Sequence, residues 1–368
     1  MRRALFLCNS VYQVLVALWI KHSLLCDDDA DIIISDHMNN GFEIKNRIKE
    51  YSSFSNAFYV KSFAFARGKV DLSNREKREL KIHPNTFIKN YIKLEHQYTE
   101  LYAASLDPFT QLLFGYIKTN NKDACVILYE DGMYTYSKLM EEDYLNTRIP
   151  VDDFSHRFIH KYIYHRNYIY GNVHRMFLFN PQYISWNPDF NILNIPKIDC
   201  NDYVFRTCCN RIFGYDDNTD CYDRKYIFME ESFYAEGTPI NDLELLNELA
   251  NKVGKENIMV KIHPRNPENR FKLDGFKTNT NTAIPWELII LNNDDLCEKT
   301  LITISSSSVL NPILIFGKKI KTYSLHKLVI EGAKSSRLLS SEFWELTKRL
   351  FENNSDTITI CNSIEEIE

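Results

Sequence analysis

Short apolar segments alternate with amphipathic segments along most of the chain. In the first half, the apolar runs predict buried strands at residues 4–8, 31–35, 57–60, 125–129 and 176–179. The segments between them have helical spacing and predict helices at residues 11–25, 41–51, 86–116 (broken near Pro108) and 136–142. This alternation is typical of a parallel sheet covered by helices.

The alternation restarts after a polar, tyrosine-rich stretch at residues 180–223, which has weak periodicity. Strands are then predicted at residues 226–230, 258–262, 300–304, 320–323 and 357–360. Helices are predicted at residues 242–253, 286–291, 312–316 and 341–351. We therefore predict an α/β protein with a domain junction in the polar stretch, giving domains at residues 1–215 and 216–368. The last helix is free to pack back on the first domain.

The apolar beginning of the chain resembles a signal peptide, because Arg2 and Arg3 precede it. Asn9, Ser10 and Gln13 interrupt the apolar run, however, and no A-x-A cleavage pattern follows. No other apolar run approaches the ~18 residues of a membrane span. We expect a buried strand followed by a helix here, and a cytoplasmic protein.

Composition excludes several kinds of protein. The formal charge of −5 and the pI near 6.1 argue against a nucleic-acid partner. The nine cysteines include no C-x-x-C pair, which indicates free thiols in a reducing compartment and no metal site. No G-x-G-x-x-G or P-loop pattern occurs among the 11 glycines, so the usual dinucleotide and P-loop fingerprints are absent.

Candidate chemistry lies where predicted strands end. Glu130, Asp131 and Gly132 follow the strand at residues 125–129, where a carboxylate on a tight turn can serve catalysis or simply cap the next helix. A second acidic residue before a glycine, Glu236, follows the strand at residues 226–230. Asp242, a little further along, is expected to cap the next helix.

A histidine–proline pair follows the strand at residues 258–262, as His263 and Pro264. Lys261 and Arg265 flank this pair, and the group suits a phosphate-bearing ligand. His83 also precedes a proline, but it follows a charged helical stretch, so we interpret it as a helix boundary.

Four consecutive serines follow the strand at residues 300–304: Ser305, Ser306, Ser307 and Ser308. Hydroxyl and backbone N–H groups at such a turn form a phosphate cradle, or one serine merely caps a helix. Glu287, at the start of a predicted short helix, could accept hydrogen bonds from ribose hydroxyls or complement the helix dipole.

Taken in order, the acid-acid-Gly, His-Pro and Ser-Ser motifs resemble those of the bacterial sialyltransferases. Within these, the chain looks most like glycosyltransferase family 52, which includes lipooligosaccharide and capsule sialyltransferases. The opening residues 8–13 are similar to that family's first strand, turn and helix. The resemblance implies a GT-B fold, in which two Rossmann-like domains face a central cleft and the second binds the nucleotide sugar.

The resemblance also implies roles for these residues in an inverting, metal-free transfer of sialic acid from CMP-sialic acid to a terminal galactoside of a surface glycan. His263 would stabilise or protonate the departing CMP, the serine turn would hold its phosphate, and Glu287 its ribose. Either Asp131 or Glu236 would be the base. Lys261, Pro264 and Arg265 would complete the donor site. The residues expected near the acceptor or donor sugar are Asn9, Ser10, Gln13, Glu130 and Gly132.

Three alternatives remain open from the sequence: transfer of a neutral sugar from a UDP-sugar, a sugar-nucleotide epimerase, and a non-catalytic binding protein. No cofactor besides the nucleotide sugar is expected. The aromatic and basic stretch at residues 158–170 suggests a peripheral contact with the inner membrane or an interface, and a homodimer is compatible with the sequence.

Overall fold

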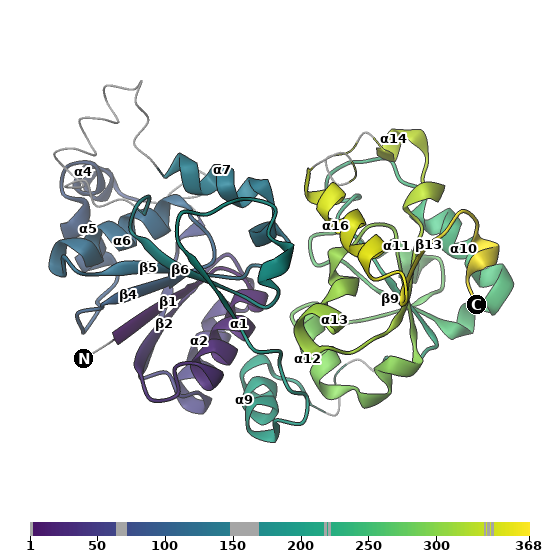
Figure 1. The fold of residues 1–368 in the computed structure, drawn as a ribbon, viewed down its shortest axis with the longest axis horizontal. Helices are drawn as coiled ribbons and strands as arrows, with labels where there is room; N and C mark the ends of the chain where they lie inside the picture. The colour runs from purple at the N-terminus through teal and green to yellow at the C-terminus, as the bar shows by residue number, and fades with distance from the viewer. Residues whose placement is uncertain are drawn as a thin grey trace. The chain divides into compact units, whose positions relative to one another are not determined.

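A computed structural model describes residues 3–63, 72–147, 169–216, 219, 222–334, 336, 339 and 342–368. The chain forms two compact units (Figure 1). The first comprises Met1–Pro196 and Thr207–Phe213, and the second comprises Lys197–Arg206 and Gly214–Glu368. The division passes through α9 (Tyr203–Phe213). Among the described residues, no helix has the length and apolar character needed to cross a membrane.

The first unit contains a seven-stranded parallel sheet with the order β3-β2-β1-β4-β5-β6-β7. Its strands are β1 (Arg3–Cys8), β2 (Asp29–Ser35), β3 (Asn56–Val60), β4 (Glu100–Ala103), β5 (Cys125–Tyr129), β6 (Val173–Leu178) and β7 (Asn191–Asn194). Its helices are α1 (Val11–Ser23), α2 (Gly41–Tyr51), α4 (Asn74–Ile82), α5 (Pro84–Tyr91), α6 (Pro108–Asn120) and α7 (Lys138–Asn146).

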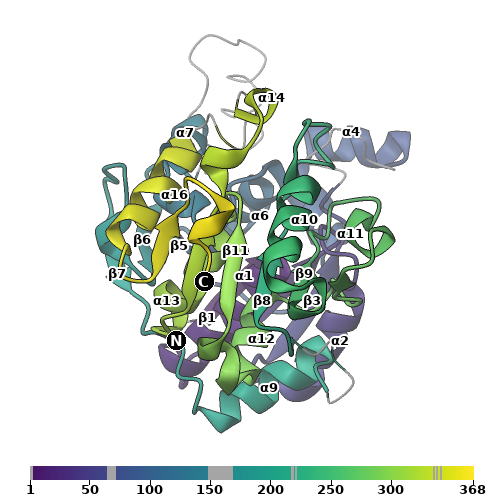
Figure 2. The same cartoon turned by 90° about the vertical axis from the view of Figure 1, so that its right-hand side faces the viewer.

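The second unit contains a six-stranded parallel sheet with the order β10-β9-β8-β11-β12-β13. Its strands are β8 (Tyr226–Met229), β9 (Ile258–Lys261), β10 (Lys277–Thr278), β11 (Thr300–Thr303), β12 (Lys321–Ser324) and β13 (Ile358–Ile360). Its helices are α10 (Asp242–Val253), α11 (Arg270–Leu273), α12 (Trp286–Asn292), α13 (Asn311–Phe316), α14 (Glu331–Lys334) and α16 (Glu342–Asn353). Figure 2 shows α10 and α16 beside these strands.

In both sheets, the order in which strands are added reverses at the centre. The reversal lies between β1 and β4 in the first sheet and between β8 and β11 in the second. This is the doubly wound order of Rossmann-like folds, in which ligands bind at the carboxyl ends of the strands near the reversal. The predicted α/β class with two Rossmann-like units is therefore confirmed. Because the strands of each sheet are parallel, all the strand-end motifs of one unit lie at the same edge of its sheet.

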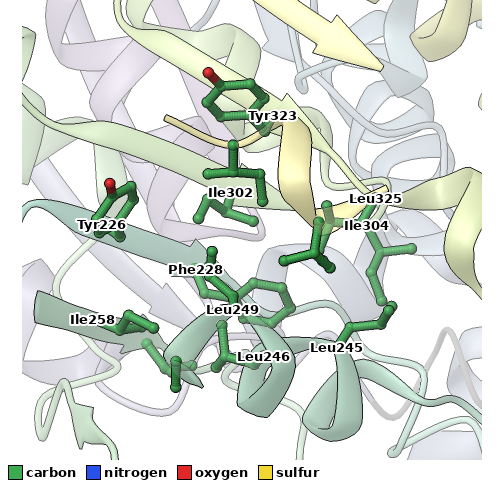
Figure 3. Packing of buried hydrophobic residues seen from close by; sticks show 14 of the residues in the cluster. Tyr226, Phe228, Leu245, Leu246, Leu249, Ile258, Ile302, Ile304, Tyr323 and Leu325 are labelled. Carbon is green, nitrogen blue, oxygen red and sulfur yellow. The ribbon is translucent and has the colours of Figure 1, made fainter. Parts of the chain in front are cut away.

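A hydrophobic cluster that includes side chains of four strands and of α10 packs against the sheet of the second unit. Figure 3 shows side chains of β8, β9, β11 and β12 with leucines of α10: Tyr226, Phe228, Ile258, Ile302, Tyr323, Leu245, Leu246 and Leu249. Central parallel strands are covered on both faces, so their sequences are almost continuously apolar. This explains why the strands that precede the candidate site were recognisable from the sequence.

The predicted helix at residues 86–116 is wrong, because this segment forms α5, β4 and α6. All four residues of β4 are buried between β1 and β5, and the Glu100 carboxylate is satisfied by Arg175 at 3.3 Å and by the Tyr102 hydroxyl at 3.0 Å. The stretch at residues 180–223 likewise holds β7 and α9, which the sequence did not predict. The interpretation of His83 is confirmed, since it lies between α4 and α5.

Candidate active site

The acid-acid-Gly motif forms a tight turn after β5. Gly132 has a φ of 61°, in the left-handed region that favours glycine, and its absent Cβ would meet no atom within 4 Å. The backbone N–H of Asp131 donates to the Thr135 hydroxyl at 2.7 Å, which closes the turn. The glycine is therefore required by backbone conformation and not by crowding.

Glu130 is buried in this turn and is fully engaged by hydrogen-bond donors. The Tyr12 hydroxyl donates to it at 2.9 Å, the Phe179 N–H donates at 2.9 Å, and the Tyr136 hydroxyl is also bonded to it. Burial nevertheless raises the pKa of Glu130 to about 7. These contacts join β5, α1 and the end of β6, so Glu130 holds the turn in place.

Asp131 is less enclosed than Glu130 and accepts one side-chain hydrogen bond, from Gln13 Nε2 at 2.8 Å. Desolvation raises the pKa of Asp131 to about 6, which the Gln13 contact partly opposes. Gln13 is fixed in turn, because its Oε1 accepts the Asn9 N–H at 2.6 Å and its own N–H donates to the Ser10 hydroxyl at 3.1 Å. The turn between β1 and α1 thus positions the Asp131 carboxylate.

Asn9 adds two contacts that pin this turn to the segment after β4. Its Nδ2 donates to Ser105 at 2.8 Å and to Asp107 at 2.7 Å. Its Oδ1 is buried and accepts no hydrogen bond from the described residues. The structure therefore brings Asn9, Ser10, Gln13 and the acid-acid-Gly motif together, as the resemblance implied.

His263 follows β9 in the second unit, and the backbone on either side of the ring fixes its state. The backbone N–H of His263 donates to Glu230 Oε2 at 2.8 Å. The ring Nδ1 accepts the backbone N–H of Arg265 at 3.2 Å. Burial, with Arg265 and Lys261 nearby, lowers the pKa of His263 to about 4. The ring is therefore neutral near pH 7, with its proton on Nε2, and acts as a hydrogen-bond donor there.

Glu230 is itself anchored by a buried ion pair. Arg270 contacts Glu230 at 3.4 Å and Asp242 at 2.7 Å. The pKa of Glu230 is raised by burial, although the His263 N–H and Arg270 oppose the shift. Asp242 is the first residue of α10 and follows Asn241, so the prediction that Asp242 caps the helix is wrong by one position.

Lys261 makes no side-chain hydrogen bond or ion pair with the described residues. Burial lowers the pKa of its ammonium group, which the nearby Glu287 and Glu230 carboxylates oppose. Glu287 is buried near the start of α12, bonded to Asn311 Nδ2, and burial raises its pKa. A lysine without a partner at a strand end is suited to an anionic ligand.

The Glu231 carboxylate anchors the serine turn, formed by residues 305–308, through hydrogen bonds. Glu231 Oε1 accepts the Ser305 N–H, and it accepts the Thr303 hydroxyl at 2.7 Å. Burial raises the pKa of Glu231 to about 7. The Thr303 hydroxyl in turn accepts the Ser306 N–H at 2.8 Å.

Part of the serine turn is therefore already satisfied by the protein. The Ser306 and Ser308 hydroxyls lie 2.7 Å apart and bond to each other. The Ser305 hydroxyl and both the hydroxyl and N–H of Ser307 have no hydrogen-bond partner among the described residues. These three donors are available to a ligand, together with the one hydroxyl proton that the Ser306–Ser308 pair leaves unused.

Glu236, the second candidate base, has a different environment from Asp131. It lies exposed in the loop after β8, before Gly237, which has a φ of 67°. Its Oε1 accepts the Ser232 hydroxyl at 2.8 Å and lies 3.9 Å from Arg265. This carboxylate is more exposed to solvent than that of Asp131.

Glu231 and Asn311, which orient the serine turn and Glu287, stand in no motif that predicted a role for them. Glu231 is the second residue after β8, and this strand-end position was the one signal that could have identified it. Among the described residues, no three His, Cys, Asp or Glu side chains are grouped as metal ligands would be. The stretch at residues 158–170 lies outside the described residues except for its last two.

Comparison with known proteins assigns the chain to a family. Residues 4–325 match the family described as Alpha-2,8-polysialyltransferase (POLYST). The chain belongs to the alpha-2,8-polysialyltransferase family. This sialyltransferase is therefore a glycosyltransferase that uses a nucleotide sugar and a glycan acceptor. The sialyltransferase activity implied by the motif resemblance is confirmed at this level.

Solved structures show the same fold in other glycosyltransferases. An alpha/beta-galactoside alpha-2,3-sialyltransferase from Photobacterium phosphoreum superposes with a TM-score of 0.54 at 12% identity, covering 100% of this chain and 99% of that chain. A glycosyltransferase of kitacinnamycin superposes with a TM-score of 0.52 at 8% identity, covering 100% and 87%. No curated protein sequence matched. The sialyltransferase thus has the predicted GT-B type of fold.

Proposed function

We propose that this sialyltransferase moves sialic acid from CMP-sialic acid to a glycan hydroxyl in one inverting displacement that needs no metal. The observation that carries the proposal is the pairing of a neutral His263, fixed as an Nε2–H donor, with an unpartnered Lys261 at the end of β9. Together they provide a hydrogen bond and a positive charge for a phosphate monoester leaving group.

In this reaction the bond between the anomeric carbon and the phosphate oxygen breaks, and its electron pair leaves with CMP. His263 Nε2–H and the Lys261 ammonium stabilise the charge that develops on that oxygen. The free donors of Ser305 and Ser307 bind the other phosphate oxygens. A bound phosphate also raises the pKa of His263 through its negative charge, so the ring would take up a second proton from solvent, pass one proton to the departing CMP oxygen and return to its neutral form.

We propose that Asp131 is the base and accepts the proton of the acceptor hydroxyl as the new glycosidic bond forms. Its desolvated carboxylate, with a pKa raised to about 6, is ionised and basic near neutral pH. Glu130 is occupied by three donors, and Glu236 is exposed beside Arg265. Both environments make these residues weaker candidates than Asp131.

The acceptor is proposed to be a glycan that already ends in sialic acid, because the family that matches is described by an alpha-2,8-polysialyl activity. A terminal galactoside on a lipooligosaccharide or capsule, as the family 52 resemblance implied, is the alternative acceptor. Either substrate agrees with the proposed donor chemistry. Action at the cytoplasmic face of the inner membrane remains part of this proposal.

Calorimetry with CMP, CMP-sialic acid, UDP and UDP-glucose tests the donor. We expect CMP to bind more tightly than UDP, with transfer from CMP-sialic acid to a sialylated oligosaccharide or to lactose identifying the acceptor. Tighter binding of UDP, together with transfer from UDP-glucose, would refute the proposal. Lys261→Met should weaken CMP binding, whereas Lys272→Met, which changes an exposed lysine of α11, should not.

A further inference from the structure

A second cluster of cations lies in the same unit as the proposed donor site but in a separate cavity. The cavity has a volume of about 300 Å³ and is lined by His326, Lys327, Lys334, Leu339, Trp344 and Lys348. These residues come from η6 (His326–Leu328), α14, α16 and the segment between the two helices. We call this the α14/α16 pocket.

The pocket lies one strand away from the serine turn, at the same edge of the sheet. Thr303 of β11 pairs with Ser324 of β12, and both Ser305 and His326 stand two residues beyond that pair. Every lining residue lies after residue 325, where the match to the sialyltransferase family ends. The pocket is therefore a feature of this chain beyond the matched region.

The lining has three lysines and a histidine and no carboxylate. Lys334 is paired with Glu331, and Lys327 donates to the neutral amide of Asn362 at 3.0 Å. The side-chain ammonium group of Lys348 makes no hydrogen bond or ion pair with the described residues. Lys348 and Lys327 lie close enough to His326 to contribute to the lowering of its pKa, to about 4, of which burial is the main cause.

The walls of the pocket are apolar as well as positive. The rings of His326 and Trp344 meet edge to face with 4.9 Å between their centroids, and the Ser324 hydroxyl bonds to His326 Nδ1 at 3.2 Å. Leu339 contributes an aliphatic surface. A bare inorganic anion would use only the lysines, whereas a sugar with a carboxylate uses both kinds of surface.

We propose that the α14/α16 pocket is a second binding site of this sialyltransferase, which holds one carboxylate-bearing sugar, a sialic acid residue of the glycan. The inference rests on the proposed function, since a sialylated acceptor or product supplies that sugar. The carboxylate binds Lys348 and Lys327, and the sugar ring packs on Trp344 and Leu339. A volume of about 300 Å³ is at the lower end of ligand pockets and suits one monosaccharide.

The test observes the pocket directly, without donor or turnover. The protein is labelled with fluorotryptophan, and the ¹⁹F resonance of Trp344 is assigned with Trp344→Phe. An α2,8-linked sialic acid trimer is titrated in the presence of saturating CMP, which occupies the nucleotide site. We expect a saturable shift of the Trp344 resonance. Lys348→Met should weaken the trimer affinity by about tenfold, because a charge-assisted contact is lost.

Two controls separate this site from general charge attraction. Lys272→Met removes one exposed lysine of the same unit and should leave the trimer affinity unchanged. Transfer to a short neutral acceptor should keep its kcat in Lys348→Met, since the pocket does not take part in the chemistry. If Lys348→Met unfolds, Lys327→Met gives the same measurement.

Several results would overturn the inference. One is a Trp344 resonance that does not respond to the trimer. Another is a Lys272→Met variant that weakens trimer binding as much as Lys348→Met does. Inorganic phosphate that shifts the resonance as strongly as the trimer would instead make this a phosphate site. Failure of the proposed function is recognised separately, because CMP-sialic acid would then neither bind nor transfer while the trimer titration still gives its own answer.

Discussion

At the scale of single residues, burial and a backbone hydrogen bond set the charge and the tautomer of His263. Burial, and then the flanking cations Arg265 and Lys261, disfavour a charged His263 ring, and the Arg265 N–H leaves only Nε2 to carry the proton. A neutral ring is a hydrogen-bond donor and cannot give up its one N–H proton. In the proposed reaction it becomes an acid only after a bound anion raises its pKa and the ring takes up a second proton.

Replacing His263 tests this assignment. His263→Ala should lower kcat by roughly 10²–10⁴, the range typical of losing a positioned acid. His83→Ala is the matched control, because His83 also precedes a proline but lies exposed between α4 and α5. Steady-state kinetics on both variants measures the difference. Near-normal activity of His263→Ala would show that another group meets the leaving phosphate.

Asp131 provides the second prediction at this scale. Since its pKa is raised to about 6 and the ionised form is the base, kcat should rise with pH through about 6 and level off above it. Asp131→Asn should abolish transfer and this pH dependence while CMP binds normally, because the proposed mechanism places Asp131 at the acceptor hydroxyl and not at the nucleotide. Glu236→Gln should retain most of the activity; a loss confined to Glu236→Gln would reverse the assignment.

At the scale of elements, Glu231 connects the end of β8 to the turn after β11. Glu231→Ala leaves the Ser305 N–H without an acceptor, at a cost of about 1–3 kcal/mol. We expect a KM for the donor roughly tenfold higher, with a smaller change in kcat, because the turn is proposed to bind the phosphate in the ground state and transition state alike. Glu231→Gln should be milder, since its amide oxygen still accepts. Unchanged donor KM in Glu231→Ala would contradict a role for the serine turn.

The same contact shows why the sequence disclosed only part of the site. Buried strands such as β8 and β11 were visible because apolar runs mark them, and the motifs at their ends followed. The bond from Ser305 to Glu231 joins residues 74 positions apart, and no local pattern encodes such a pairing. The short strand β4 was missed for a related reason: its four residues include Glu100, which tertiary contacts satisfy.

The choice between Asp131 and Glu236 was likewise beyond a motif, because both precede a glycine after a strand. Their difference lies in solvation, which depends on how α1 packs near β5 and how Arg265 lies beside the loop after β8. Sequence patterns thus predicted where chemistry could occur. The fold determines which of the two carboxylates, Asp131 or Glu236, is more shielded from solvent.

At the scale of the whole molecule, the transferase is expected to work without a divalent cation. In the proposed mechanism, Lys261, His263 and the free donors of the serine turn would supply the charge and hydrogen bonds that a metal would otherwise bring to a nucleotide phosphate. Initial rates of transfer should therefore be unchanged in excess EDTA. Activity that disappears on chelation and returns with Mg²⁺ or Mn²⁺ would contradict this prediction.

The buried carboxyl groups also connect folding to acidity. Glu130 and Glu231 each have a pKa raised by burial to about 7, against about 4.3 in an unfolded chain. Between these values the folded protein holds protons that the unfolded chain releases, so folding takes up protons from solvent. Stability from this source is complete below about pH 4 and is lost as the pH rises through 7. Asp131, the proposed base, must lose its proton before it can act. The transferase therefore gains activity with rising pH over the same interval in which it loses part of its stability against unfolding.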